Sequence, residues 1–179
     1  KTVCANNAAA ALSGLVAGGT TTGEWSTGGS GSFSPNPFDL NATYNPSPAD
    51  IAGGSVTLIL TSTGNGACVA VTDSLLLTIT PAPTANAGLN DTVCADTAGY
   101  TLAGSVTVAT GGVWTTAGSG LFNDSSLLAA KYTPGAADTA AGFVNLILTT
   151  TGNGLCLPVS DTMILVITPA PNANAGPDQ

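Results

Sequence analysis

The sequence contains no histidine and almost no positive charge. Its 179 residues include two lysines and no arginine against ten acidic residues, which gives a net charge of −8. Without histidine, a Ser-His-Asp or Cys-His nucleophile cannot be built, and neither lysine lies in a Gly-x-x-x-x-Gly-Lys phosphate loop. So few cations cannot neutralise a phosphate backbone or an anionic lipid surface. We therefore expect that the chain is not an enzyme and that it binds neither nucleic acid nor membranes.

Charged residues and long apolar runs are also scarce. Charged residues make up 7% of the chain, against about 25% in a typical domain. Serine, threonine, glycine and alanine replace them, so the predicted surface is neutral and rich in hydroxyl groups. No apolar run approaches the roughly 18 residues that span a bilayer. The sequence starts at Lys1 without a signal-peptide pattern, so we expect a piece of a longer, processed protein.

The two halves of the sequence are related copies of each other, and the spacing between matching residues falls from 90 to 88 along the chain. Landmark residues return in the same order: Cys4 and Cys94, Trp25 and Trp114, Tyr44 and Tyr132. This repetition predicts two domains of the same kind. We place the first in residues 1–83, with a proline-rich, extended linker at 80–84, and the second in residues 85–171. Residues 172–179 resemble the start of the second copy and predict a linker or a further repeat.

Each repeat has the alternation of apolar and polar residues that β-strands show, and neither has a helical stripe. Val56, Leu58 and Leu60 alternate with polar residues and predict a central strand, as does the matching segment 144–148. The Gly-Asn-Gly that follows predicts a tight hairpin. Shorter strands are expected at 12–16, 24–26 and 42–45. About seven strands per repeat predict an all-β fold of tandem Ig-like, Greek-key sandwiches.

The large aromatic residues of each repeat are predicted to anchor its core. One tryptophan, Trp25 or Trp114, is large enough to fill the space between two sheets, and stacking on a ligand is the alternative. The tyrosines Tyr44 and Tyr132 are each followed by a proline two residues later. We expect each ring to point inward and each hydroxyl to be hydrogen-bonded locally.

Each repeat carries two cysteines, which are Cys4 and Cys68 in the first and Cys94 and Cys156 in the second. Symmetry predicts one disulfide within each repeat, from its first strand to its final hairpin. Such a bond closes a loop of about 60 residues and is worth roughly 4 kcal/mol in the chain-entropy model. It also implies an oxidising, extracellular setting. Zinc is the alternative, but a four-cysteine site needs both repeats.

The acidic residues lie mostly in predicted turns. Asp50 and Asp138 recur at matching positions, which suits side chains that cap loops, although paired carboxylates also occur in glycosidases. The best calcium candidate is the pair Asp91 and Asp96, but no Asp-x-Asp-x-Asp loop accompanies it. We therefore expect no cofactor, with calcium at Asp91 and Asp96 as a weak alternative.

Several motifs together resemble the PKD-like or Ig-like repeats of giant Bacteroidetes surface proteins. The motifs are Gly-Leu-Asn-Asp-Thr-Val-Cys at 88–94, Gly-x-Phe at 31–33 and 120–122, and Leu-Ile-Leu-Thr-x-Thr-Gly-Asn-Gly-x-Cys ending at Cys68 and Cys156. The resemblance covers the whole chain. It implies a repeat of an adhesin or of a large extracellular fibre, with no shared ligand site and no catalytic residue.

An Asp-(Ser/Thr)-apolar pattern, which is similar to the O-glycosylation sequon of Bacteroidetes secreted proteins, occurs five times. The candidate glycan acceptors are Ser74, Thr92, Thr97, Thr139 and Thr162. The alternative is that aspartate and threonine are common where turns meet strands.

Two functions follow from the sequence. The first is a structural repeat of an extracellular or cell-surface filament, which provides length, stiffness and protease resistance, with neighbouring repeats or copies of itself as partners. The second is an adhesive module that binds glycan or protein through the loops at one end of the sandwich. Phe33, Phe38 and Phe122 are the aromatic loop candidates for that role.

Overall fold

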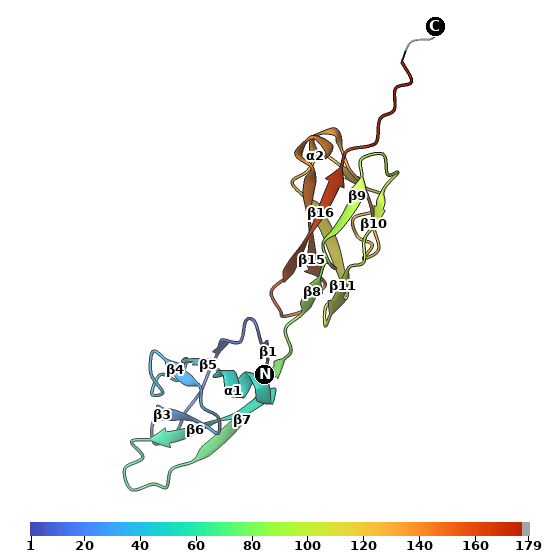
Figure 1. The fold of residues 1–179 in the computed structure, drawn as a ribbon. Helices are drawn as coiled ribbons and strands as arrows, with labels where there is room; N and C mark the ends of the chain where they lie inside the picture. The colour runs from blue at the N-terminus through green and yellow to red at the C-terminus, as the bar shows by residue number, and fades with distance from the viewer. Residues whose placement is uncertain (177–179) are drawn as a thin grey trace. The chain divides into compact units, whose positions relative to one another are not determined.

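The computed structural model describes residues 1–176, which form sixteen strands and two short helices (Figure 1). The chain divides into two compact units. The first unit comprises Lys1–Ala82 together with the short segment Leu155–Leu157, and the second comprises the other described residues from Pro83 onward. Segment 155–157 is the exception to the division that the sequence repeat predicts, because it belongs to the second repeat in sequence.

The first unit is a sandwich of two sheets. One sheet has the order β1-β7-β6-β3 and the other has the order β2-β5-β4. The bounds are β1 Thr2–Cys4, β2 Ala10–Ala11, β3 Thr22–Thr27, β4 Ser32–Ser34, β5 Thr43–Asn45, β6 Ser55–Thr63 and β7 Thr72–Thr80, with helix α1 at Pro48–Gly53. Strand β1 runs parallel to β7, and the other pairs are antiparallel.

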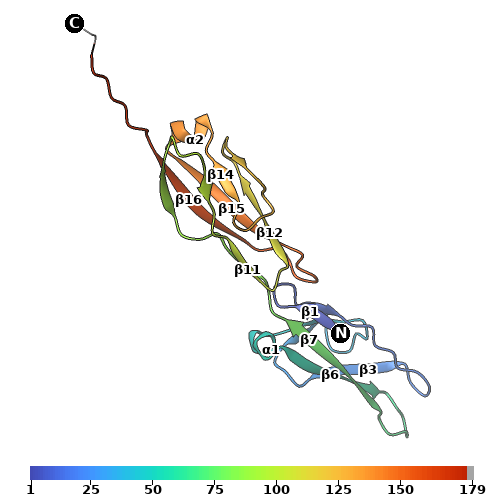
Figure 2. The same cartoon turned by 90° about the vertical axis from the view of Figure 1, so that its right-hand side faces the viewer.

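The second unit repeats this topology, with the sheets β12-β15-β16-β9 and β10-β14-β13, and adds a two-stranded ribbon β8-β11. The bounds are β8 Thr84–Asn86, β9 Asp91–Cys94, β10 Tyr100–Thr101, β11 Ser105–Thr107, β12 Gly111–Thr116, β13 Leu121–Phe122, β14 Lys131–Thr133, β15 Phe143–Thr151 and β16 Ser160–Thr168, with α2 at Ala136–Ala141. Helix α2 and the β15–β16 loop lie at opposite ends of this unit (Figures 1 and 2). The predicted all-β, Ig-like sandwich class is confirmed.

Alternation along the strands builds the core of each unit. On β6, Val56, Leu58 and Leu60 point inward and are buried, while the residues between them face outward. Trp25 is buried against them, and its indole N–H donates to the Leu40 carbonyl at 3.2 Å. Trp114 is equivalent in the second unit. Burying each ring contributes about 4–6 kcal/mol.

Two local predictions were wrong. The residues after β6 do not form a tight hairpin, because β7 begins only at Thr72; Gly64 and Gly66 do adopt positive φ, at 66° and 60°. The strand expected at 12–16 is displaced to β2. The Gly14 N–H still donates to the Leu40 carbonyl, but a Cβ at Gly14 would lie 2.9 Å from the Trp25 ring. The backbone here therefore packs against the tryptophan ring and does not continue a regular β-ladder.

The two helices were not expected, because six residues are too short to show a 3.6-residue period. The signals for α1 are nevertheless present. Ser47 caps its first turn, Pro48 occupies the position after the cap, Asp50 closes a capping box, and Gly54 ends the helix with φ of 72°. Serine, proline and aspartate at this spacing are a local signature of a helix start, which the hydrophobic period does not contain.

The proline-rich segment between the repeats is short. Strand β7 ends at Thr80 and β8 begins at Thr84, so residues 81–83 are the part without regular structure. Of the extended segment expected at 80–84, the first residue therefore belongs to β7 and the last to β8. Of the segment expected to start a further repeat, residues 177–179 lie outside the described residues. Within residues 1–176, neither helix is long and apolar enough to cross a membrane.

Candidate functional site

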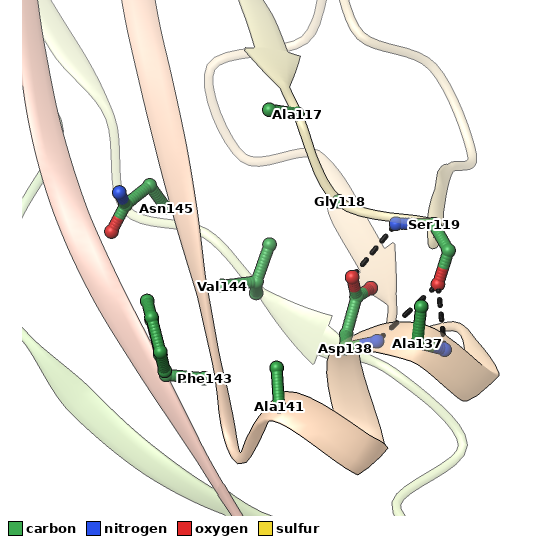
Figure 3. A pocket seen from close by; sticks show the side chains of 9 residues that line it. All are labelled: Ala117, Gly118, Ser119, Ala137, Asp138, Ala141, Phe143, Val144 and Asn145. Carbon is green, nitrogen blue, oxygen red and sulfur yellow. Dashed lines mark hydrogen bonds between the residues drawn. The ribbon is translucent and has the colours of Figure 1, made fainter.

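The candidate site is a shallow groove beside the short helix, and it occurs in both units. In the second unit the groove has a volume of about 370 Å³ and lies between α2, the end of β12 and the start of β15 (Figure 3). The matching groove beside α1 has a volume of about 560 Å³. One carboxylate lies at the side of each groove, Asp138 in the second unit and Asp50 in the first.

The Asp138 carboxylate is buried and accepts three hydrogen bonds. It accepts from the Tyr132 hydroxyl at 2.7 Å and from the backbone N–H of Gly135 at 2.9 Å. It also accepts from the backbone N–H of Ser119 at 2.7 Å (Figure 3). The Tyr132 hydroxyl in turn accepts from the backbone of Gly120 at 3.2 Å. One carboxylate therefore joins the helix start, strand β14 and the loop after β12.

Asp50 forms the same network in the first unit. It accepts from Tyr44 at 2.8 Å, from the Ser47 N–H at 2.9 Å and from the Ser30 N–H at 3.1 Å. The Tyr44 ring is fully buried, and Gly31 donates to its hydroxyl at 3.1 Å. A side chain at Gly31 would collide with that hydroxyl, so the close approach requires glycine.

These hydrogen bonds shift the pKa values of both the aspartates and the tyrosines. Burial by itself raises the pKa of Asp50, but the hydrogen bonds from Ser47, Tyr44 and Ser30 outweigh burial and lower the pKa from 3.8 to about 2. The pKa of Asp138 is lowered for the same reasons. Burial, followed by the neighbouring carboxylate, raises the pKa of Tyr132 to about 12. The carboxylate is therefore ionised and the phenol is neutral over the physiological range.

This arrangement connects three segments of the fold through one carboxylate. Each carboxylate accepts three hydrogen bonds from protein donors, and the groove beside Asp138 is otherwise lined by small and apolar side chains together with Ser119 and Asn145. A general acid or base needs a proton to exchange with substrate, and a paired-carboxylate mechanism needs a second acid in reach. Asp50 and Asp138 instead hold loop, helix and strand together, as side chains that cap loops do.

The cysteines are the second candidate feature, and their predicted pairing was wrong. The disulfide joins Cys4 to Cys156, with the Cα atoms 5.0 Å apart and a sequence separation of 152. Cys68 and Cys94 are free in the described chain. Since residues 155–157 belong to the first unit, the bond lies within that unit.

The direction of β1 explains the error. Because β1 is parallel to β7, Cys4 lies beside Thr80, the last residue of β7, whereas Cys68 precedes the first residue of that strand. Eight steps along a strand separate the two ends by about 26 Å. A disulfide requires Cα atoms about 4.4–6.8 Å apart. The same geometry excludes a bond between Cys94 and Cys156, because β9 is parallel to β16.

The residues around Cys4 hold the incoming loop in place. The Asn6 side-chain amide donates to the Leu157 carbonyl at 2.9 Å, and the Leu157 N–H donates back to the amide oxygen at 3.1 Å. Cys4 has no exposed surface. The disulfide is therefore accompanied by a reciprocal pair of hydrogen bonds, which we call the Asn6 seat.

The other predicted site residues are dispersed. Asp91 accepts from the Tyr100 hydroxyl at 2.9 Å and from the Thr92 N–H at 2.7 Å, and Asp96 is exposed. No group of three or more candidate metal ligands exists among residues 1–176. Of the glycan candidates, Ser74, Thr92, Thr139 and Thr162 are exposed and Thr97 is partly buried.

No family model matches the chain, and no curated protein matches it. Solved structures of cadherin fragments are similar to it at low levels. Human mucin-like protocadherin EC1-2 is 13% identical with a TM-score of 0.35, and the alignment covers 94% of this chain and 95% of that one. Drosophila N-cadherin EC1-4 is 13% identical with a TM-score of 0.43, covering 95% and 47%. Likeness at this level says nothing about function.

The tyrosine–aspartate networks predict a loss of stability in acid. A carboxylate whose pKa is depressed by folding stabilises the fold above its unfolded pKa, and this contribution disappears as the pH falls through the folded value. For Asp50 that window runs from about pH 4 to about pH 2. We expect the free energy of unfolding, measured in urea, to fall across this window. A double variant with Asp50→Asn and Asp138→Asn should be less stable at pH 7 and show a smaller fall; an unchanged fall contradicts the assignment.

Proposed function

We propose that the chain is a structural repeat of a long extracellular fibre. The observation that carries this proposal is the Cys4–Cys156 disulfide, which joins the first strand of one repeat to the last loop of the next. A bond of this kind favours an oxidising, extracellular compartment. The neutral, hydroxyl-rich surface and the engaged carboxylates of both grooves agree with a role that requires durability and no chemistry.

The position of the disulfide gives it a mechanical consequence. Tension applied to the two ends of the chain passes from residues 1–4 directly to residues 156–179 through the sulfur atoms. The residues between the two cysteines bear none of the tension, whatever the arrangement of the two units. The residues between the two cysteines are thus protected against extension, as a fibre under shear or pulling requires. Strand β16 lies outside the bridge and is not protected by this bond.

Adhesion through aromatic loop residues is the second candidate function, and the packing of these residues disfavours it. The Phe33 ring lies 5.1 Å from the Tyr44 ring, and Phe122 lies 4.9 Å from Tyr132, so two of the three candidates pack against the core. Phe38 is exposed, but one aromatic side chain provides little contact area. We therefore favour the structural role.

Pulling experiments on single molecules test the proposed function. When the oxidised chain is stretched from its ends, only the 26 or so residues outside the disulfide extend, for about 90 Å, whereas the reduced chain extends by about 600 Å. Cys156→Ala should behave like the reduced chain without reductant. The matched control Cys68→Ala should behave like the oxidised parent. Long extension of the oxidised parent would refute a tension-bearing role for the disulfide.

We further propose that the exposed hydroxyls of Ser74, Thr92, Thr139 and Thr162 carry glycans in the native protein. Their side chains lie on the surface, where a transferase reaches them. Thr97 is partly buried and is the weakest of the five candidates. Intact mass spectrometry of native material should give a mass above that of the polypeptide, with the excess removed by chemical deglycosylation. The bare polypeptide mass would exclude this modification.

A further inference from the structure

The two free cysteines are repeat copies of the two bonded ones. Cys94 occupies in the second repeat the position of Cys4, and Cys68 occupies in the first repeat the position of Cys156. We infer that Cys94 and Cys68 are the two halves of a further bridge of the same kind, and that another copy of this repeat closes each of them. The partner is thus the complementary cysteine of a second copy of this chain.

The backbone around Cys94 already has the geometry found around Cys4. Cys94 lies beside Thr168 at the end of β16, as Cys4 lies beside Thr80 at the end of β7. In both copies the threonine hydroxyl donates to the strand at 3.1 Å, through Thr168 to Val93 and through Thr80 to Val3. The free cysteine is therefore presented in the conformation that the bonded one uses.

The loop that carries Cys68 likewise matches the bonded loop. Positive φ angles of 66° and 60° recur at Gly64 and Gly66 and at the corresponding glycines 152 and 154. The asparagine between each pair of glycines donates to a carbonyl three residues earlier, at 3.0 Å in the first repeat and 3.1 Å in the second. The strand that carries Cys94 and the loop that carries Cys68 thus have the backbone conformations found around Cys4 and Cys156, without the disulfide.

Neither free cysteine can bond to the other cysteine of its own repeat. Cys68 and Cys4 lie at opposite ends of β7, and Cys94 and Cys156 lie at opposite ends of β16, which places each pair about 26 Å apart. The loop of Cys68 also exposes an apolar residue, Val69, which is 88% exposed. Val69 corresponds to Leu157, whose backbone is bound in the Asn6 seat.

The closure is a thiol–disulfide exchange and needs an oxidant. A Cys94 thiolate attacks a small-molecule disulfide such as oxidised glutathione, forms a mixed disulfide and releases one reduced thiol. The Cys68 thiolate of a second chain then attacks the protein sulfur and displaces the second reduced thiol. Two protein thiols are oxidised, one glutathione disulfide is reduced to two thiols, and one protein–protein bond forms.

One residue of the seat differs between the copies. Asp96 stands in the second repeat where Asn6 stands in the first. A carboxylate can accept the N–H of an incoming loop but cannot donate to its carbonyl, so one of the two reciprocal hydrogen bonds is lost. We therefore expect the Cys94 seat to close less readily than the Cys4 seat.

Two single-cysteine variants of the full chain test the inference. Cys68→Ala leaves only Cys94 free, and Cys94→Ala leaves only Cys68 free. In a buffer of oxidised and reduced glutathione, a mixture of the two should yield one covalent dimer and nothing larger. Its yield should exceed that of either variant alone by at least about tenfold, because only unlike cysteines fit the seat. The parent chain should form a ladder of longer species.

The outcomes on a non-reducing gel separate the alternatives. Equal dimerisation by either variant alone would show random oxidation of exposed thiols and would overturn the inference, as would a mixture that stays monomeric. Asp96→Asn, introduced into the variant that retains Cys94, should raise the dimer yield by about fivefold by restoring the missing donor. Asp124→Asn, which removes the same charge at an exposed loop, is the matched control and should leave the yield unchanged.

Discussion

The parallel pairing of the first strand with the last strand of each sandwich determines which cysteines of this protein can form disulfides. It places the cysteine of the first strand beside the end of the last strand, and it leaves the second cysteine at the loop before that strand begins. Each repeat therefore carries its two thiols about 26 Å apart. A repeat with this layout cannot close its own disulfide, so any disulfide that it forms joins it to a cysteine of another repeat.

The tyrosine–aspartate network provides the internal stability that such a repeat needs. The Cys4–Cys156 disulfide joins β1 to segment 155–157 and does not include the short strands β2, β4 and β5, which depend on packing and hydrogen bonds. Asp50 and Asp138 supply several of these bonds from a single buried carboxylate, and they do so in both copies with the same partners.

Because Cys94 precedes Cys156 in the sequence, a further bridge from Cys94 would begin before the first bridge ends. In a longer array, successive bridges would overlap and leave no part of the chain outside them.

The sequence was sufficient for the fold class but not for the connections. Alternation on β6 and β15 predicts sandwiches because a buried face imposes a period of two, and this class is confirmed. The same alternation occurs whether a neighbouring strand is parallel or antiparallel. The residues therefore could not predict the direction of β1, and this direction determines the partner of Cys4. Helices α1 and α2 have six residues each, which is too few for their sequences to show a 3.6-residue hydrophobic period. The hydrogen bond that the Tyr132 hydroxyl donates to Asp138 joins a strand to a helix, and only the folded chain shows the proximity of these two groups.

Disulfide mapping of the oxidised protein tests the central claim most directly. Digestion with pepsin at acid pH, where thiols do not exchange, followed by mass spectrometry identifies which cysteine peptides are linked. The parallel strand pairing predicts one linked pair that contains Cys4 and Cys156. A linked pair that contains Cys4 and Cys68, or Cys94 and Cys156, would contradict it.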